Sequence, residues 1–191
     1  MIKIGNNLSE WSSYSCQPKT SLELKEIVDE RIRKQGPNCD LNDIDTSLIE
    51  DMSCLFQRMN FNGNISEWNT SKVKNMYNLF AFSNFTGDIS KWDTSKVEDM
   101  YNMFAYSKFN GDISNWNVSK VKEMSLMFYK SVFNGDISKW DVSNVDDMTN
   151  MFYDSNFNQD ISNWKIRKNC CTTNMFNLCS IKDEYKPKLP R

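Results

Sequence analysis

The sequence predicts an α/β repeat solenoid of about five to six coils, each 24 residues long. Tryptophan returns at a constant interval of 24 residues, and phenylalanine and methionine keep the same interval in further columns. Within each unit the apolar period changes from the alternation of a strand to the spacing of a helix. Because the interval contains no insertions, we expect the coils to stack in register around a buried tryptophan ladder. The ladder comprises Trp68, Trp92, Trp116, Trp140 and Trp164.

Residues 1–36 are expected to form a polar segment followed by a capping helix. Thr20 or Ser21 can cap the first turn of this helix, and Gly36 followed by proline is a strong stop signal. The helix would cover the open apolar end of the first coil, as terminal units of repeat arrays do. A membrane anchor is the disfavoured alternative, because the polar face mixes acidic and basic residues. The helix also carries Leu22, and its apolar stripe comprises Leu24, Ile27, Val28 and Ile32.

Residues 37–181 are expected to form the repeat array, with a short strand, a short helix and a turn in every coil. In one unit, alternation over residues 116–118 predicts a strand that pairs in parallel with its neighbours about 4.8 Å away. Apolar residues spaced three and four apart over 121–128 then predict a helix. Asn110-Gly111 predicts a turn in which glycine supplies a positive φ. Residues 182–191 should form an extended, exposed tail.

One aspartate returns at the turn of each coil, which raises the question of a metal site. We expect each carboxylate to accept N–H bonds of its own turn. A calcium ladder is the alternative, but one aspartate per coil supplies too few oxygens for a calcium shell. The sequence also lacks histidine and any CxxC pair, so we expect no metal and no cofactor. The column comprises Asp88, Asp112, Asp136 and Asp160.

Composition narrows the function classes. There are 23 basic and 25 acidic residues, for a net charge of −2, so a nucleic-acid partner is not expected. The absence of histidine removes Ser-His and Cys-His catalysis, and we expect no enzyme. No apolar run is long enough for a membrane span. The six cysteines do not resemble a disulfide framework, which allows a cytoplasmic location.

Four aromatic residues outside the core columns are the candidate binding residues: Tyr77, Phe82, Tyr101 and Tyr106. Stacked coils would place them in adjacent pairs, and exposed aromatic patches are typical of recognition surfaces. Their columns carry serine, threonine, lysine and aspartate in later coils, so the repeat does not require aromatic residues there. Packing between coils that half-buries these rings is the alternative.

The unit FNGDISxWxxSxVxxMxxMF resembles the repeat of BspA-like leucine-rich-repeat surface proteins and the related mycoplasma-type lipoprotein repeat. The resemblance covers residues 44 to about 181. It implies a right-handed, leucine-rich-repeat-like coil and a surface or secreted protein that acts in adhesion and recognition. The chain shows neither a secretory signal nor a lipobox cysteine, so its compartment stays open.

These observations favour a non-enzymatic interaction module. The partner would be a protein, of a host or a cell surface, or a glycan, and we expect the module to be a monomer. Two alternatives remain at this point. One is a purely structural scaffold rod, and the other is an intracellular regulator or effector that binds a protein partner. An exposed, contiguous aromatic patch would favour recognition, whereas an evenly polar surface would favour the rod.

Overall fold

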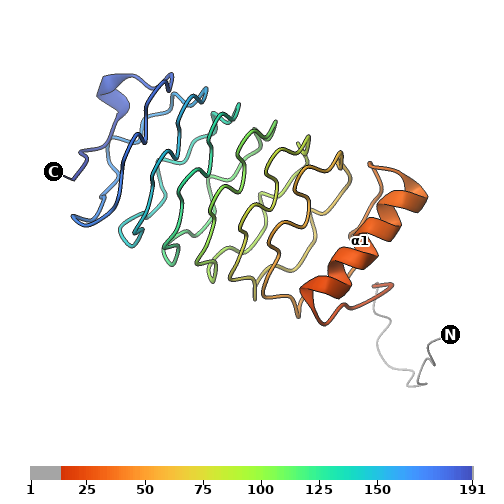
Figure 1. The fold of residues 1–191 in the computed structure, drawn as a ribbon. Coiled ribbons are helices and arrows are strands. Elements are labelled where there is room, and N and C mark those ends of the chain that lie inside the picture. Colours follow the sequence, from red (N-terminus) through yellow and green to blue (C-terminus); the bar gives the residue numbers. More distant parts are fainter. Residues whose placement is uncertain (1–13, 191) are drawn as a thin grey trace.

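A computed structural model describes residues 14–190 as a stack of coils that ends in a helix on one side (Figure 1). The helix α1 spans Ser21–Gln35, and a single turn of 3-10 helix, η1, spans Asp183–Tyr185 near the other end. Neighbouring coils are joined by isolated parallel bridges between residues 24 positions apart. This step reproduces the sequence repeat, so one repeat forms one coil. The main series of bridges joins Asp51, Asn75, Asp99, Glu123, Asp147 and Cys171.

The predicted α/β, leucine-rich-repeat-like solenoid is wrong. Over residues 14–190 the structure has α1 as its one α-helix, and strand pairing is confined to isolated bridges without a sheet. Residues 116–118 do not form the expected strand, and residues 121–128 form turns in place of a helix. Pairing between coils occurs instead at the column of Asp99 and Glu123.

Left-handed residues explain why the coils contain no helix. Each coil places two non-glycine residues at positive φ, four positions apart, such as Asn78 (56°) with Phe82 (57°) and Asn102 (55°) with Tyr106 (54°). An α-helix needs negative φ at every residue, so neither segment can be helical. The other pairs at the same positions are Cys54 and Arg58, Leu126 and Lys130, Asn150 and Asp154, and Asn174 and Leu178.

Main-chain hydrogen bonds between coils replace the missing sheet. Along each turn segment, alternate N–H groups donate to carbonyls of the following coil, as from Met76 to Asp99 (2.9 Å) and from Phe80 to Met103 (2.9 Å). The intervening N–H groups close turns within their own coil, as from Leu79 to Met76 (3.2 Å). The buried backbone is therefore satisfied without regular secondary structure. Throughout this segment the donors point toward the C-terminal end of the stack and the acceptors toward the N-terminal end.

The core is a set of aromatic columns that run through the stack. The Phe80, Phe104 and Phe128 rings are fully buried and stack at 5.7 Å between successive centroids. The ladder tryptophans are 3–5 % exposed, and each Nε1 donates to a main-chain carbonyl 27 residues earlier, as Trp116 does to Ile89 (3.1 Å). Burial therefore leaves the indole N–H paired at every step of the ladder.

The Asn-Gly turns differ from the prediction in one respect. Gly36 is the one glycine with positive φ in the described residues, so the turn glycines do not supply left-handed geometry. They make room instead: a Cβ at Gly111 would lie 2.8 Å from Cζ of Phe109, and one at Gly135 would lie 2.8 Å from Cζ of Phe133. Glycine at these turns thus allows the second phenylalanine column to pack against the backbone.

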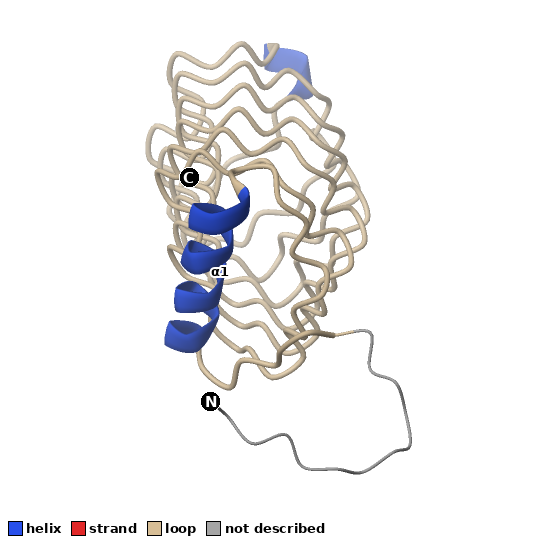
Figure 2. Cartoon of the chain, turned by 90° about the vertical axis from the view of Figure 1, so that its right-hand side faces the viewer, coloured by secondary structure: helices blue, strands red, loops and turns tan. Residues whose placement is uncertain are grey.

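The helix α1 forms where the sequence predicts it. The Thr20 side chain accepts from the Glu23 N–H, and the Gly36 N–H bonds to the Ile32 carbonyl at the other end. Figure 2 shows α1 lying across the end of the stack, where Leu24 and Val28 are fully buried.

The C-terminal segment is only in part the extended, exposed tail predicted for residues 182–191. The helix η1 interrupts it, and Pro187 is buried. The Tyr185 carbonyl accepts from the Ile161 N–H (3.0 Å), and the Tyr185 ring packs against the core. Apolar contacts with the last coil account for the difference, because they order a segment that has no apolar pattern of its own.

Candidate functional site

The four predicted binding residues form two stacked pairs on the outer surface of adjacent coils. Tyr77 and Tyr101 lie with ring centroids 5.0 Å apart, and Phe82 and Tyr106 with centroids 4.5 Å apart. Tyr77, Phe82 and Tyr106 are 37 %, 40 % and 44 % exposed, whereas Tyr101 is half-buried. Within residues 14–190 no ring contact joins the two pairs. Asn102 Nδ2 donates a hydrogen bond to Asn78 Oδ1 (2.6 Å). In each coil, this asparagine lies in the sequence between the two aromatic residues.

Left-handed backbone geometry positions the second pair. Phe82 and Tyr106 both have positive φ, which is uncommon for bulky residues and carries a conformational cost. Hydrogen bonds to the following coil hold this geometry, from the Phe82 N–H to Ala105 (2.8 Å) and from the Tyr106 N–H to Tyr129 (2.9 Å). Both rings remain exposed, whereas Ala81 and Ala105 beside them in the chain are buried.

The second pair continues into two further tyrosines. Tyr129 lies 5.5 Å from Tyr106 at an angle of 59°, and Tyr153 stacks on Tyr129 at 5.2 Å. We call Phe82, Tyr106, Tyr129 and Tyr153 the aromatic stripe. Tyr129 and Tyr153 are also visible in the sequence beside the core columns, but the candidate set leaves them out because it confines the patch to two coils. The step of 23 residues from Tyr106 to Tyr129 places them one column earlier and is the signal that could have joined them to the set.

Two cations border the aromatic stripe. The Arg58 guanidinium lies 4.6 Å from the Phe82 centroid, and Lys130 Nζ lies 5.8 Å from Tyr106 and 5.7 Å from Tyr129. Both faces of Phe82 are therefore covered, one by Arg58 and the other by Tyr106, and its exposed surface is the ring edge. Lys130 also contacts Asp154 (3.5 Å), whereas Arg58 has no acidic partner within 4 Å among residues 14–190.

Partial burial affects the ionisation of these tyrosines. Desolvation raises the pKa of Tyr101 and of Tyr129 above the ordinary phenol value. A phenol is protonated at neutral pH even without this shift, and a protonated phenol can donate as well as accept a hydrogen bond.

The aspartate column forms a separate, polar face of the stack. Each carboxylate accepts the main-chain N–H of the serine two residues later at 2.9 Å, for Asp88, Asp112, Asp136 and Asp160 alike. Hydrogen bonding from those serines lowers the pKa of all four carboxyls. Gln159 replaces the turn glycine before Asp160 without lengthening this bond.

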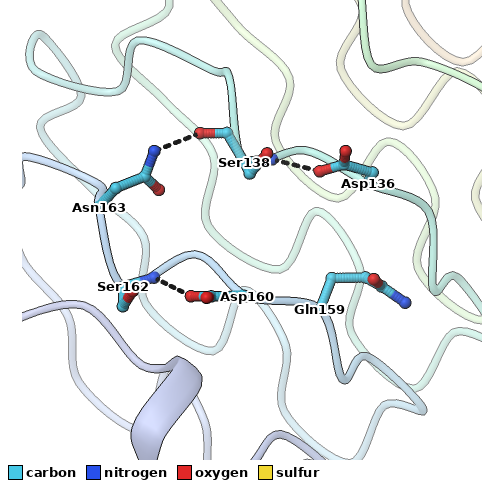
Figure 3. A pocket seen from close by; sticks show the side chains of 6 residues that line it. All are labelled: Asp136, Ser138, Gln159, Asp160, Ser162 and Asn163. Carbon is cyan, nitrogen blue, oxygen red and sulfur yellow. Dashed lines mark hydrogen bonds between the residues drawn. The ribbon is translucent and has the colours of Figure 1, made fainter.

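Figure 3 shows an open, polar hollow between two members of this column. Asn163 Nδ2 donates to the Ser138 carbonyl (3.0 Å) at its rim. Both aspartates point their bonded oxygens at their own turns, so the hollow does not gather several carboxylates around one point. Its lining comprises Asp136, Ser138, Gln159, Asp160, Ser162 and Asn163.

Residues 14–190 contain neither a cluster of metal ligands nor a membrane-spanning helix. No group of three or more histidine, cysteine, aspartate or glutamate side chains in this part of the chain is placed to hold a metal ion. No helix found there has the length and apolar character needed to cross a membrane.

Together, the coils and their aromatic surface define a repeat protein in which stacked turns present side chains on an open face. The family described as "Mycoplasma protein of unknown function, DUF285" matches the chain over residues 24–132 and 81–186. The chain belongs to this family. The match supports the mycoplasma-type resemblance of the repeat, whereas the resemblance to BspA-like leucine-rich-repeat proteins is not confirmed. Neither the curated proteins nor the solved structures include a match to this chain.

Proposed function

We propose that this protein is a non-enzymatic recognition module that binds a protein partner through the aromatic stripe and the neighbouring pair Tyr77 and Tyr101. The observation that carries the proposal is the continuous run of partly exposed rings across four coils, with contacts from Phe82 through Tyr153. Tyrosine is enriched at protein interfaces, because one rigid side chain supplies both apolar area and a hydroxyl.

The arrangement of the rings favours a protein over a glycan. A sugar packs its C–H groups on an open aromatic face, but Arg58 and Tyr106 cover the two faces of Phe82. The exposed ring edges are electropositive, and the tyrosine hydroxyls donate hydrogen bonds. The ring edges and the hydroxyl donors can both interact favourably with carbonyl and carboxylate oxygens of a protein surface. Arg58, which has no acidic partner within residues 14–190, adds a site for an acidic side chain of the partner.

The repeat itself favours recognition over a purely structural rod. The columns of Tyr101 and Tyr106 carry Ser125 and Lys130 one coil later, and the backbone there keeps the same positive φ and the same bonds between coils. The stack therefore forms with polar residues at these positions, and the rings are not required to build a coil.

A double variant tests the proposal, with substitutions taken from the repeat itself. Tyr101→Ser and Tyr106→Lys copy Ser125 and Lys130, so we expect the melting temperature to change little. The partner is first captured on the immobilised full chain and identified, and its affinity for purified variants is then measured. The double variant should bind about 100-fold more weakly, as the loss of two central aromatic contacts implies.

The matched control is Leu48→Lys. Leu48 is 38 % exposed, lies in a different column, and is replaced by the lysine that this column carries in the next coil at Lys72. This variant should bind as the unmodified chain does. If the double variant binds with unchanged affinity, or if it unfolds, the stripe serves to pack the coils and the proposal is wrong.

A further inference from the structure

The two ends of the stack differ in how their main-chain groups are satisfied. At the N-terminal end, α1 supplies donors to carbonyls of the first coil: Ser21 Oγ donates to the Asp51 carbonyl (2.5 Å) and Lys25 Nζ to the Leu55 carbonyl (3.0 Å). In later coils the equivalent carbonyls of Asn75 and Leu79 accept from the coil before. The helix thus substitutes for a preceding coil.

At the C-terminal end the corresponding donors have no acceptor in the part of the chain that the structure describes. In the last full pair of coils, the Met148 N–H bonds to Cys171 (2.8 Å) and the Phe152 N–H to Met175 (2.9 Å). One coil later, four N–H groups occupy the same positions, and within residues 14–190 none of them has a hydrogen-bond acceptor. We call these four groups the donor row. It consists of the N–H groups of Thr172, Asn174, Phe176 and Leu178.

Side chains beside the donor row are also uncovered. Phe128 and Phe152 are fully buried, whereas Phe176 at the end of the same column is half-buried, with Lys186 Nζ 6.0 Å from its centroid. Leu178 is 66 % exposed. Lys186 of the C-terminal segment lies beside the Phe176 ring, but none of the described carbonyls of this segment bonds to the donor row; that of Tyr185 bonds to Ile161 on another part of the coil.

We propose that the donor row is a second interaction site, which binds an extended segment of a partner protein through the main-chain carbonyls of that segment. Adding a chain to an unpaired edge is a general mode of peptide recognition, in which the main chain supplies affinity and side chains supply specificity. Four donors at every second residue match a segment of about 7 residues. Phe176 and Leu178 would contact its apolar side chains.

A second copy of the chain does not fit the donor row. Among residues 14–190, carbonyls in the right register at an end of the stack belong to the first coil, and α1 covers that end. Two C-terminal ends facing each other would both present N–H groups along this segment, because the carbonyls of the row close turns with Met175, Asn177 and Cys179. The donor row consists of main-chain groups of the last coil, whereas the aromatic stripe consists of side chains of earlier coils; Leu178 continues the column of Phe82 and Tyr106.

A peptide that copies residues 123–130 tests the donor row directly. Within the stack, the carbonyls of Glu123, Ser125, Met127 and Tyr129 accept from the preceding coil, so this peptide carries acceptors in the required order. It is titrated into the isotope-labelled full chain while amide NMR signals and hydrogen exchange are followed. We expect shifts concentrated at the four amides of the donor row, whose exchange should slow by about tenfold or more.

The same peptide made of D-amino acids is the control for nonspecific adsorption, since it has the same composition but cannot place its carbonyls in the same way. We expect no response to it. The proposal is overturned if the L-peptide leaves the four amides unchanged up to about 1 mM. It is also overturned if both peptides act alike, or if the shifts lie elsewhere.

A pair of adjacent threonines provides matched variants. Thr172→Pro removes one donor of the row, and that N–H has no acceptor among the described residues, 14–190. Thr173→Pro removes an N–H outside the row, at a turn position before the left-handed Asn174 where proline is favoured. Thr172→Pro should weaken binding of the L-peptide about tenfold, the loss of roughly one main-chain bond, and Thr173→Pro should not. Equal affinities of the two variants would contradict the assignment.

Discussion

At the scale of single residues, Trp116 shows how one side chain serves two purposes in the core. Its indole is 4 % exposed and its Nε1 donates to the Ile89 carbonyl (3.1 Å). Trp116→Ala removes both the packing and the bond and should cost ~3–5 kcal/mol of unfolding free energy. Trp116→Phe keeps much of the volume and should cost distinctly less. Denaturant titration of the three proteins checks this order, and equal losses for both variants would contradict the stacked core.

Two neighbouring cysteines should differ in reactivity. Burial raises the pKa of Cys170 to about 11, whereas hydrogen bonds from Thr149 and Thr173 lower the pKa of the exposed Cys171. The reactive species is the thiolate, and a lower pKa gives more of it at a given pH. An alkylating reagent near pH 8 should therefore label Cys171 well before Cys170. Mass spectrometry of digests taken at successive times measures the order of labelling. Faster labelling of Cys170 than of Cys171 would contradict the prediction.

At the scale of elements, α1 is the part that the sequence predicts best. Its cap at Thr20, its stop at Gly36 and its apolar stripe are local signals, and local signals suffice for a helix that docks as one unit. The coils were predicted wrongly because turns closed between residues three apart, as from Met127 to Met124, place side chains at nearly helical spacing. Apolar periodicity cannot separate the two, since the difference lies in the sign of φ at Leu126 and Lys130.

The candidate site, like the fold, could be predicted from the sequence only in part. Aromatic residues that repeat in one column, such as Tyr77 with Tyr101, are visible from the 24-residue interval. Tyr129 joins the stripe through a shift of one position between columns, which depends on the path of the backbone. Arg58 lies 24 residues before Phe82 in the same column, so its contact with that ring follows from the repeat interval. The donor row could not be predicted from the sequence, because its identification requires the direction of the main-chain hydrogen bonds between coils.

The contact of α1 with the first coil can be tested with two leucines of the same helix. Leu24 is fully buried and Leu22 is 69 % exposed. Leu24→Ala should lower the unfolding free energy by ~2–5 kcal/mol, because it leaves a cavity under the helix. Leu22→Ala should change it by less than ~0.5 kcal/mol. Thermal and denaturant unfolding measure both. Similar small effects for the two variants would mean that α1 does not cap the stack.

At the scale of the whole molecule, the repeated aspartates couple stability to pH. The pKa of each turn carboxyl lies below its ordinary value of 3.8 in the folded chain, so the folded state favours the ionised form. This contribution is present above pH 3.8 and is lost as the pH falls through the lower folded values. The free energy of unfolding should therefore fall on acidification from about pH 6 to 3.

The exposed position of these carboxyls makes each contribution small, but the repeat adds them together. Replacing Asp112 and Asp136 with asparagine keeps an acceptor for the Ser114 and Ser138 N–H groups, as Asn64 does for Ser66. The double variant should lose less stability than the unmodified chain between the same two pH values. An unchanged pH dependence would show that other groups are responsible.

If the coils are turns whose main-chain N–H groups bond forward to the next coil, residue-resolved amide hydrogen exchange should show it. The N–H groups of Phe80, Phe104, Phe128 and Phe152 bond to the following coil and should exchange slowly, whereas that of Phe176 should exchange fast. A helix in each coil would instead protect successive amides on both sides of each phenylalanine, including Phe176. Slow exchange at Phe176 together with the other four would contradict this account.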